Sequence, residues 1–247
     1  LIAAICAGLP AVASADFIAY NDFVTPYTLD TNVTHWGYDN SGAQILKDHD
    51  TGAAVTPTMT TTYYHISHNT SGPAAEISAG TDAANIFGGK VSTRTTVDAY
   101  NSGYLGNWYV EVLLQDLDPA KSYNLAAVLD RGSTSYINRR WTLISLLDTD
   151  SSTYASSSGA YQVSATSVSI DCYNTVNGYV AMWTGIKPGA DGDLILRFAP
   201  AVDAELPEAY RLTNEDGRGY APAGLMLQEV PEPASMALLA LGALGLL

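Results

Sequence analysis

The amino-acid sequence predicts an all-β protein, an antiparallel β-sandwich flanked by apolar helical segments at the two termini. Helical periodicity is almost absent between residues 16 and 229. Short runs rich in Tyr, Trp, Val, Ile and Thr alternate instead with clusters of Gly, Asn, Asp and Ser. Two of these clusters, Asn177-Gly178 and Asp191-Gly192, supply residues that tolerate positive φ in turns. Strands spaced in this way, without helices between them, favour a sandwich over an α/β fold.

The expected strands follow one another along the body of the chain. They occupy residues 17–20, 55–64, 108–114, 123–129, 141–147, 168–172, 179–183, 194–198 and 224–229. Pro57 is expected to interrupt the second of them, because proline cannot donate to a strand ladder. The Gly/Ser/Ala-rich residues 66–90 suit a long loop with a short segment near Ala83-Asn85-Phe87.

Alternation along the strands predicts which side chains are buried. Trp108, Val110, Val112 and Leu114 share one face of their strand, and Glu111 lies on the other. Cys172 ends an alternating apolar run and is expected to be a buried small hydrophobe rather than a reactive thiol. Core packing is also the usual role of tryptophans in or beside strands, which here are Trp36, Trp108, Trp141 and Trp183.

The first 15 residues form an apolar run that ends at Ala13-Ser14-Ala15. Ala13 and Ala15 are the small residues that a signal peptidase accepts at positions −3 and −1, so this segment resembles a secretory signal peptide. It lacks an initiator Met and a charged leading region, and the chain is therefore expected to be clipped at its start. The alternative is a buried apolar element at the domain edge.

The other end of the chain reads Val230-Pro231-Glu232-Pro233, followed by an uncharged, Ala/Leu-rich stretch to Leu247. The prolines make the first part extended, and the rest favours a short helix of about 21 Å, less than a hydrocarbon core of about 30 Å. Residues 230–247 resemble the PEP-CTERM sorting signal of exported bacterial proteins, although the basic cluster that normally ends this signal is missing. The resemblance implies transient anchoring in the inner membrane, recognition by an exosortase-type protease, and delivery to the cell surface or extracellular space.

The two signals leave one predicted domain at residues 16–229, between a signal peptide at 1–15 and a sorting signal at 230–247. The whole chain carries 11 Lys+Arg against 25 Asp+Glu, a net charge of −14; removing Glu232 leaves 24 acidic residues and −13. This balance argues against nucleic acid as a partner, because phosphate binding needs a Lys/Arg surface. With Cys172 as its single Cys, the exported body has no internal disulfide.

One short motif concerns the kind of sandwich. Leu117-Asp118-Pro119-Ala120-Lys121-Ser122-Tyr123 is similar to the turn-into-strand corner of fibronectin type III and related sandwiches. That resemblance implies that the Tyr123 hydroxyl bonds back to the backbone upstream. The body is about twice the length of a fibronectin domain, so both a jelly roll and an immunoglobulin- or fibronectin-like sandwich stay open.

No catalytic constellation is recognisable, and we predict no catalytic residues and no metal ligands. No Ser has Gly at both −2 and +2, and His65 and His68 lie in a strand-and-loop setting. Three acidic turns resemble parts of calcium loops without completing one, and they leave a structural Ca²⁺ open: residues 48–52, 148–152 and 191–193.

The best candidate for a ligand patch is Arg139-Arg140-Trp141, since a guanidinium beside an indole can hold a sugar hydroxyl or carboxylate. We therefore expect a non-catalytic, exported β-sandwich protein with a structural or adhesive role in the envelope or extracellular polysaccharide matrix. Polysaccharide is its candidate ligand. The alternative is a jelly-roll carbohydrate-active enzyme, which would need two carboxylates converging within about 5–10 Å.

Overall fold

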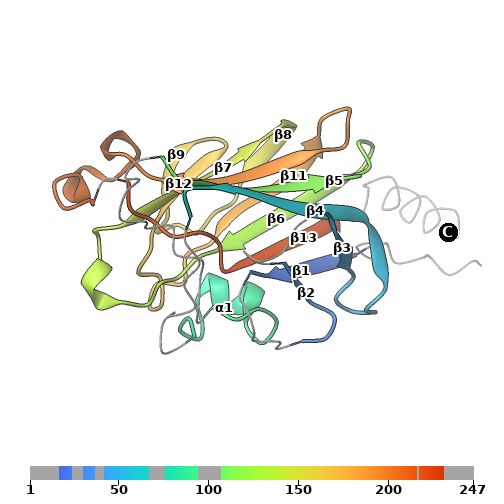
Figure 1. The fold of residues 1–247 in the computed structure, drawn as a ribbon, viewed down its shortest axis with the longest axis horizontal. Coiled ribbons are helices and arrows are strands. Elements are labelled where there is room, and N and C mark those ends of the chain that lie inside the picture. Colours follow the sequence, from blue (N-terminus) through green and yellow to red (C-terminus); the bar gives the residue numbers. More distant parts are fainter. Residues whose placement is uncertain are drawn as a thin grey trace, which may run out of the picture.

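A computed structural model of the chain describes residues 17–23, 30–36, 42–66, 76–93, 107–215 and 217–230. Within these residues, a six-stranded and a seven-stranded sheet pack face to face (Figure 1). All neighbouring strands are antiparallel except the short β1–β2 pair. The predicted antiparallel β-sandwich is thus confirmed, while the terminal segments expected to be helical lie outside the described residues.

The six-stranded sheet, called sheet A, contains the first and last strands of the body. Its order is β2 (Thr34–His35), β1 (Ile18–Asp22), β13 (Gly224–Val230), β6 (Ser122–Val128), β11 (Ala181–Pro188) and β8 (Thr149–Tyr154). β13 therefore lies in the interior of the sheet, hydrogen-bonded to β1 on one side and to β6 on the other.

The seven-stranded sheet is called sheet B. Its order is β3 (Gln44–Lys47), β4 (Ala54–Tyr64), β5 (Tyr109–Gln115), β12 (Leu194–Pro200), β7 (Trp141–Leu147), β10 (Ser167–Asp171) and β9 (Tyr161–Ser164). At one side of the sandwich β1 and β2 of sheet A contact β3 of sheet B. At the other side the sheets end in β8 and β9.

The core between the sheets is built by the inward faces of these strands. Trp108, Val110, Val112 and Leu114 are all buried, as the alternation along β5 predicts. Trp36 and Trp183 belong to the same cluster, and so does Cys172, which is a buried free thiol as expected.

Trp141 is buried as well, but on the outer face of sheet B. On β7 it is Ile144 and Leu146 that face the sandwich core, whereas Trp141 packs in a separate cluster with Ala201 and Leu206. The cover comes from two short 3-10 helices at Asp203–Glu205 and Glu208–Tyr210. The Tyr210 ring stacks on Trp141 with the ring centroids 5.5 Å apart.

The outer face of sheet A is covered by residues 76–93, which include helix α1 (Asp82–Phe87), seen below β13 and β1 in Figure 1. Phe87 and Val91 pack there against Ala126, Val128 and other side chains of this face. This second cluster explains why β6 is buried on both faces in its second half, where strict alternation predicts exposed side chains.

Both predicted glycine turns have the expected backbone. Gly178 has a φ of +56° and Gly192 a φ of +77°. Each also allows a close approach: a Cβ on Gly178 would lie 2.1 Å from the Thr81 hydroxyl, and one on Gly192 would lie 2.4 Å from the Leu117 carbonyl oxygen. These turns therefore dock α1 and the β5–β6 turn onto the sandwich.

Two sequence-based expectations about strands were wrong. Pro57 does not interrupt β4, because it lies at an irregularity in the β3 pairing and just before the β5 ladder begins at Thr58. Residues 148–152, interpreted as an acidic turn that resembles the opening of a calcium loop, lie mostly in the strand β8, Thr149–Tyr154. The short strands β2, β3 and β9 had no clear apolar alternation and were not predicted.

Candidate functional site

The strand that precedes the predicted sorting signal is held firmly in the domain. The ladder between β13 and β6 continues to the pair Val230–Ser122, the last described residue of the chain. The Glu229 backbone N–H donates to the Phe17 carbonyl oxygen at 3.2 Å, and the Glu229 carboxylate lies 3.0 Å from the Lys121 ammonium group. Pro231, Glu232 and Pro233 follow Val230 directly in the sequence and lie outside the described residues.

The body begins beside the place where it ends. Ile18 is the register partner of Gln228, so Phe17 and Glu229 lie side by side at one end of the sandwich. Ala13 and Ala15, the predicted signal-cleavage residues, lie outside the described residues. The turns 116–121 and 189–193 lie at this same end, while the 3-10 helices of residues 203–210 lie at the opposite end (Figure 1).

A cleft of about 460 Å³ opens beside this junction. Its lining includes Phe17, Tyr123, Glu229 and residues 54–57. Burial raises the pKa of the Tyr123 phenol to about 12, so this hydroxyl stays protonated at neutral pH.

Several carboxylates crowd the turns at the same end. Burial raises the pKa of Asp193, and the neighbouring charges of Asp191, Asp148 and Asp116 raise it further. The calcium-like turn predicted at 148–152 does not curve around a position where a cation could bind. Thr149–Tyr154 is an extended strand instead, and it spaces alternate side chains about 6–7 Å apart. Among the described residues there is no group of three or more His, Cys, Asp or Glu arranged to hold a metal ion.

The acidic turn at residues 48–52 is occupied by its own hydrogen bonds. The Asp48 carboxylate accepts from the Thr51 hydroxyl at 2.6 Å and from the Ile18 backbone N–H at 3.2 Å. The Thr51 hydrogen bond is the main reason that the pKa of Asp48 lies below its ordinary value. This turn therefore fastens the start of β1 to sheet B.

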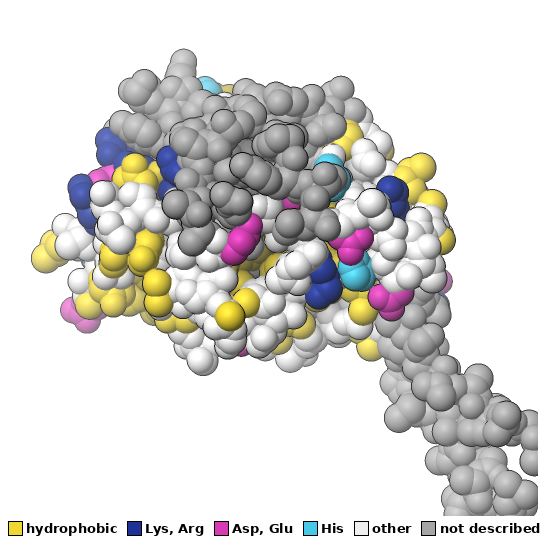
Figure 2. All heavy atoms as spheres, turned by 90° about the horizontal axis from the view of Figure 1, so that it is seen from below, with side chains coloured by type: hydrophobic (Ala, Val, Ile, Leu, Met, Phe, Trp, Pro, Cys, Tyr) yellow, Lys and Arg dark blue, Asp and Glu magenta, His cyan; other side chains and the backbone are white. Residues whose placement is uncertain are grey.

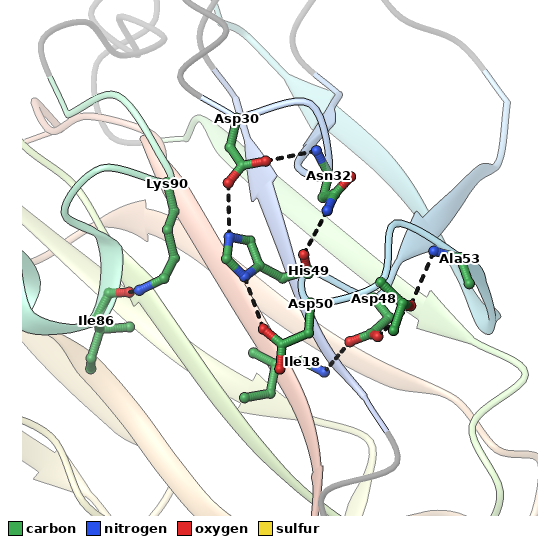
Figure 3. Close-up of polar contacts among 10 residues, drawn as sticks. Ile18, Asp30, Asn32, Asp48, His49, Asp50, Ala53, Ile86 and Lys90 are labelled. Carbon is green, nitrogen blue, oxygen red and sulfur yellow. Dashed lines mark hydrogen bonds and ion pairs between the residues drawn. The ribbon is translucent and has the colours of Figure 1, made fainter.

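His49 in that turn lies between two carboxylates (Figure 3). Its Nε2 is 3.0 Å from Asp30 Oδ2 and its Nδ1 is 3.4 Å from Asp50 Oδ1. The imidazole and the Tyr20 ring lie edge to face with their centroids 5.2 Å apart, and the Lys90 ammonium group lies 5.1 Å from the centre of the Tyr20 ring. We call these five residues the His49 clasp; it joins β1, the loop before β2, the β3–β4 turn and the turn after α1.

On the face that is seen from below in Figure 1, acidic and basic side chains occur together. Figure 2 shows the face seen from below in Figure 1, where Asp/Glu, Lys/Arg and His side chains of the described residues lie in small mixed groups.

The predicted ligand patch is largely internal. Arg139 has a half-exposed side chain, but Arg140 and Trp141 are buried. Arg140 Nε donates to Glu215 at 2.9 Å, its guanidinium lies 3.7 Å from the centre of the Tyr136 ring, and it also donates to the Tyr220 hydroxyl. Arg139 and Arg218 bind the same Glu215 carboxylate. Arg140 and Trp141 thus support the fold, and binding of a ligand by this patch stays a prediction.

Two buried carboxylates beside this cluster were not singled out from the sequence. Asp130 accepts hydrogen bonds from the Gly132 and Asn174 backbones and from the Thr175 hydroxyl. Asp171 accepts from the Asn138 and Tyr173 backbones. Burial raises the pKa of each to about 6. The only signal in the sequence was an Asp in or directly after an apolar strand.

One comparison with known proteins found a match. Residues 229–247 match the PEP-CTERM protein-sorting motif, which agrees with the resemblance of residues 230–247. This motif marks an exported protein that is recognised by an exosortase and sorted toward the cell surface. No curated protein and no solved structure is significantly similar to the chain. None of the helices in the described part of the chain is long and apolar enough to cross a membrane.

Proposed function

We propose that this chain is a non-catalytic protein of the cell envelope or extracellular polysaccharide matrix, with a structural or adhesive role. The observation that carries the proposal is the junction at Val230, where an interior strand of the sandwich runs directly into the sorting motif. With Phe17 beside Glu229, a chain held in the membrane by its C-terminal segment would present the opposite end of the sandwich outward. That end carries the 3-10 helices and the Arg139–Glu215 cluster.

The packing of the aromatic residues bears on how such a protein would contact polysaccharide. Sugar-binding sites commonly stack pyranose rings on exposed aromatic faces, but Trp36, Trp108, Trp141 and Trp183 are all buried. Tyr64 stacks on Tyr109 but stays 45% exposed, as does Tyr63, and the Arg197 guanidinium lies over Tyr109. Contact with polysaccharide would therefore use the exposed tyrosines and the hydroxyl, amide and charged groups of the surface rather than tryptophan platforms.

The test is to express the full chain in a bacterium that has an exosortase, and to compare it with the double variant Pro231→Ala/Pro233→Ala. The intact chain should be processed and recovered with the surface or matrix fraction, and the double variant should stay unprocessed in the membrane fraction. Pro207→Ala, which changes a proline far from the motif, serves as the control and should behave as the intact chain. Release of the processed protein as a free component of the medium, with unchanged matrix mass and cohesion, would contradict the structural role.

A further inference from the structure

One stretch of this acidic chain carries no charge. Residues 151–170 contain no Asp, Glu, Lys or Arg, and no Pro or His. They form most of β8, all of β9 and most of β10, so they lie together at the side of the sandwich where both sheets end. The charge of −14 is therefore distributed over the rest of the chain.

The outer side of β9 is an open sheet edge within the described structure. β9 pairs with β10 only, and no backbone hydrogen bond joins residues 161–164 to another described segment. Gln162, Val163 and Ser164 are exposed, with Val163 at 37%. A strand at an edge carries backbone N–H and C=O groups that can pair with another strand.

The two edges of sheet B differ in how they are protected. At the β3 edge, Lys47 places a charge on the edge strand, an irregularity interrupts its pairing with β4, and β1 and β2 pack close by. These are the features by which proteins normally prevent edge-to-edge pairing. β9 carries none of the charged or proline residues that serve this purpose, and its one irregularity lies on the inner side, against β10.

We propose that β9 pairs antiparallel with β9 of a second copy of this chain, which joins the seven-stranded sheets of two molecules. A second copy is the partner that the charges favour, because two chains of −14 repel each other at most approaches and least at an uncharged edge. Two identical strands can pair antiparallel about a twofold axis, so the edge is its own complement. With a strand of four residues the contact is weak in solution and becomes effective where many copies are held on one surface.

This self-association does not depend on the matrix role proposed above. It can be measured on the full chain in detergent micelles, which accommodate the apolar termini, by sedimentation equilibrium over a range of concentrations. The expected result is a reversible dimer. Val163→Lys should raise the dissociation constant about tenfold or more, since it places like charges across the contact. The matched control is Ile45→Lys on β3, which changes an exposed β-branched residue at the opposite edge of sheet B and should dimerise as the unmodified chain.

A rescue experiment separates loss of pairing from damage to the fold. An equimolar mixture of Val163→Lys and Val163→Glu should form heterodimers at least as tightly as the unmodified chain forms homodimers, because opposite charges then meet across the axis. Recovery of heterodimers supports β9 pairing even if each variant alone is monomeric. An unmodified chain that stays monomeric up to about 1 mM would overturn the proposal. Equal increases in the dissociation constant for Val163→Lys and Ile45→Lys would overturn it as well.

Discussion

The backbone N–H of Asp118 donates a hydrogen bond of 2.9 Å to the hydroxyl oxygen of Tyr123. Tyr123 is buried at the start of β6, and Asp118 lies in the turn that leads into this strand. This is the corner that the fibronectin-like motif implied, and it closes the end of the sandwich next to the sorting junction. The hydroxyl accepts from a backbone group that has no other partner among the described residues.

Replacing this tyrosine tests the contribution of the corner. Tyr123→Phe should lower the free energy of unfolding by about 1–3 kcal/mol, because the Asp118 N–H is left without an acceptor. Urea denaturation of the full chain in micelles measures the change. The control is Tyr161→Phe on β9, whose side chain is half-buried and does not belong to the core cluster. A comparable loss there would argue against a special role of the corner.

The cluster around Glu215 should be far more sensitive than an exposed ion pair. Glu215→Gln removes the carboxylate shared by Arg139, Arg140 and Arg218, and it takes a charged partner away from the buried Arg140 guanidinium. We expect a loss of about 3 kcal/mol, together with faster proteolysis of residues 201–218. The matched variant Glu111→Gln breaks the more exposed pair with Arg197 and should cost less than about 1 kcal/mol. The free energy of unfolding is measured by urea denaturation. Equal decreases in Glu215→Gln and Glu111→Gln would show that burial does not set the contribution of these ion pairs to stability.

Asp130 and Asp171 make the stability depend on pH in an unusual direction. The pKa of each is about 6 in the folded protein, above the ordinary Asp value of 3.8, so the folded state binds protons more tightly than the unfolded state between these values. The free energy of unfolding should therefore rise as the pH falls from about 7 to 4, by about 2–3 kcal/mol for each group.

His35 opposes this trend, because burial lowers its pKa and its unfolded form gains a proton first. The two contributions can be separated by urea denaturation at several pH values. His35→Gln should steepen the rise toward low pH, and Asp171→Asn should flatten it. An unchanged pH profile in Asp171→Asn would show that this carboxyl titrates normally in the folded chain.

The His49 clasp should control local opening rather than global stability. His49→Ala removes the side chain between Asp30 and Asp50, both of which keep contact with water. Because the groups are partly exposed, we expect a loss of about 1 kcal/mol or less in unfolding. Hydrogen exchange should nevertheless accelerate in residues 30–36 and 48–53. Protection that is unchanged in both segments would mean that backbone contacts alone hold these loops.

Much of this protein was determined by local chemistry that can be recognised along the chain. The alternation of β5 specifies its buried face, the glycines at 178 and 192 specify their turns, and the Val-Pro-Glu-Pro motif specifies sorting. Each of these depends on residues close in sequence, so backbone preference and side-chain period suffice to predict it.

Only the tertiary structure decided the rest, because it depends on which distant segments cover a given face. Trp141 is buried on the outer face of β7 because residues 201–210 pack over it, and Ala126 is buried because residues 76–93 cover sheet A. Arg140 is internal because Glu215, far along the chain, supplies its counter-charge. Burial of this kind is a property of long-range packing, and alternation within one strand carries no information about it.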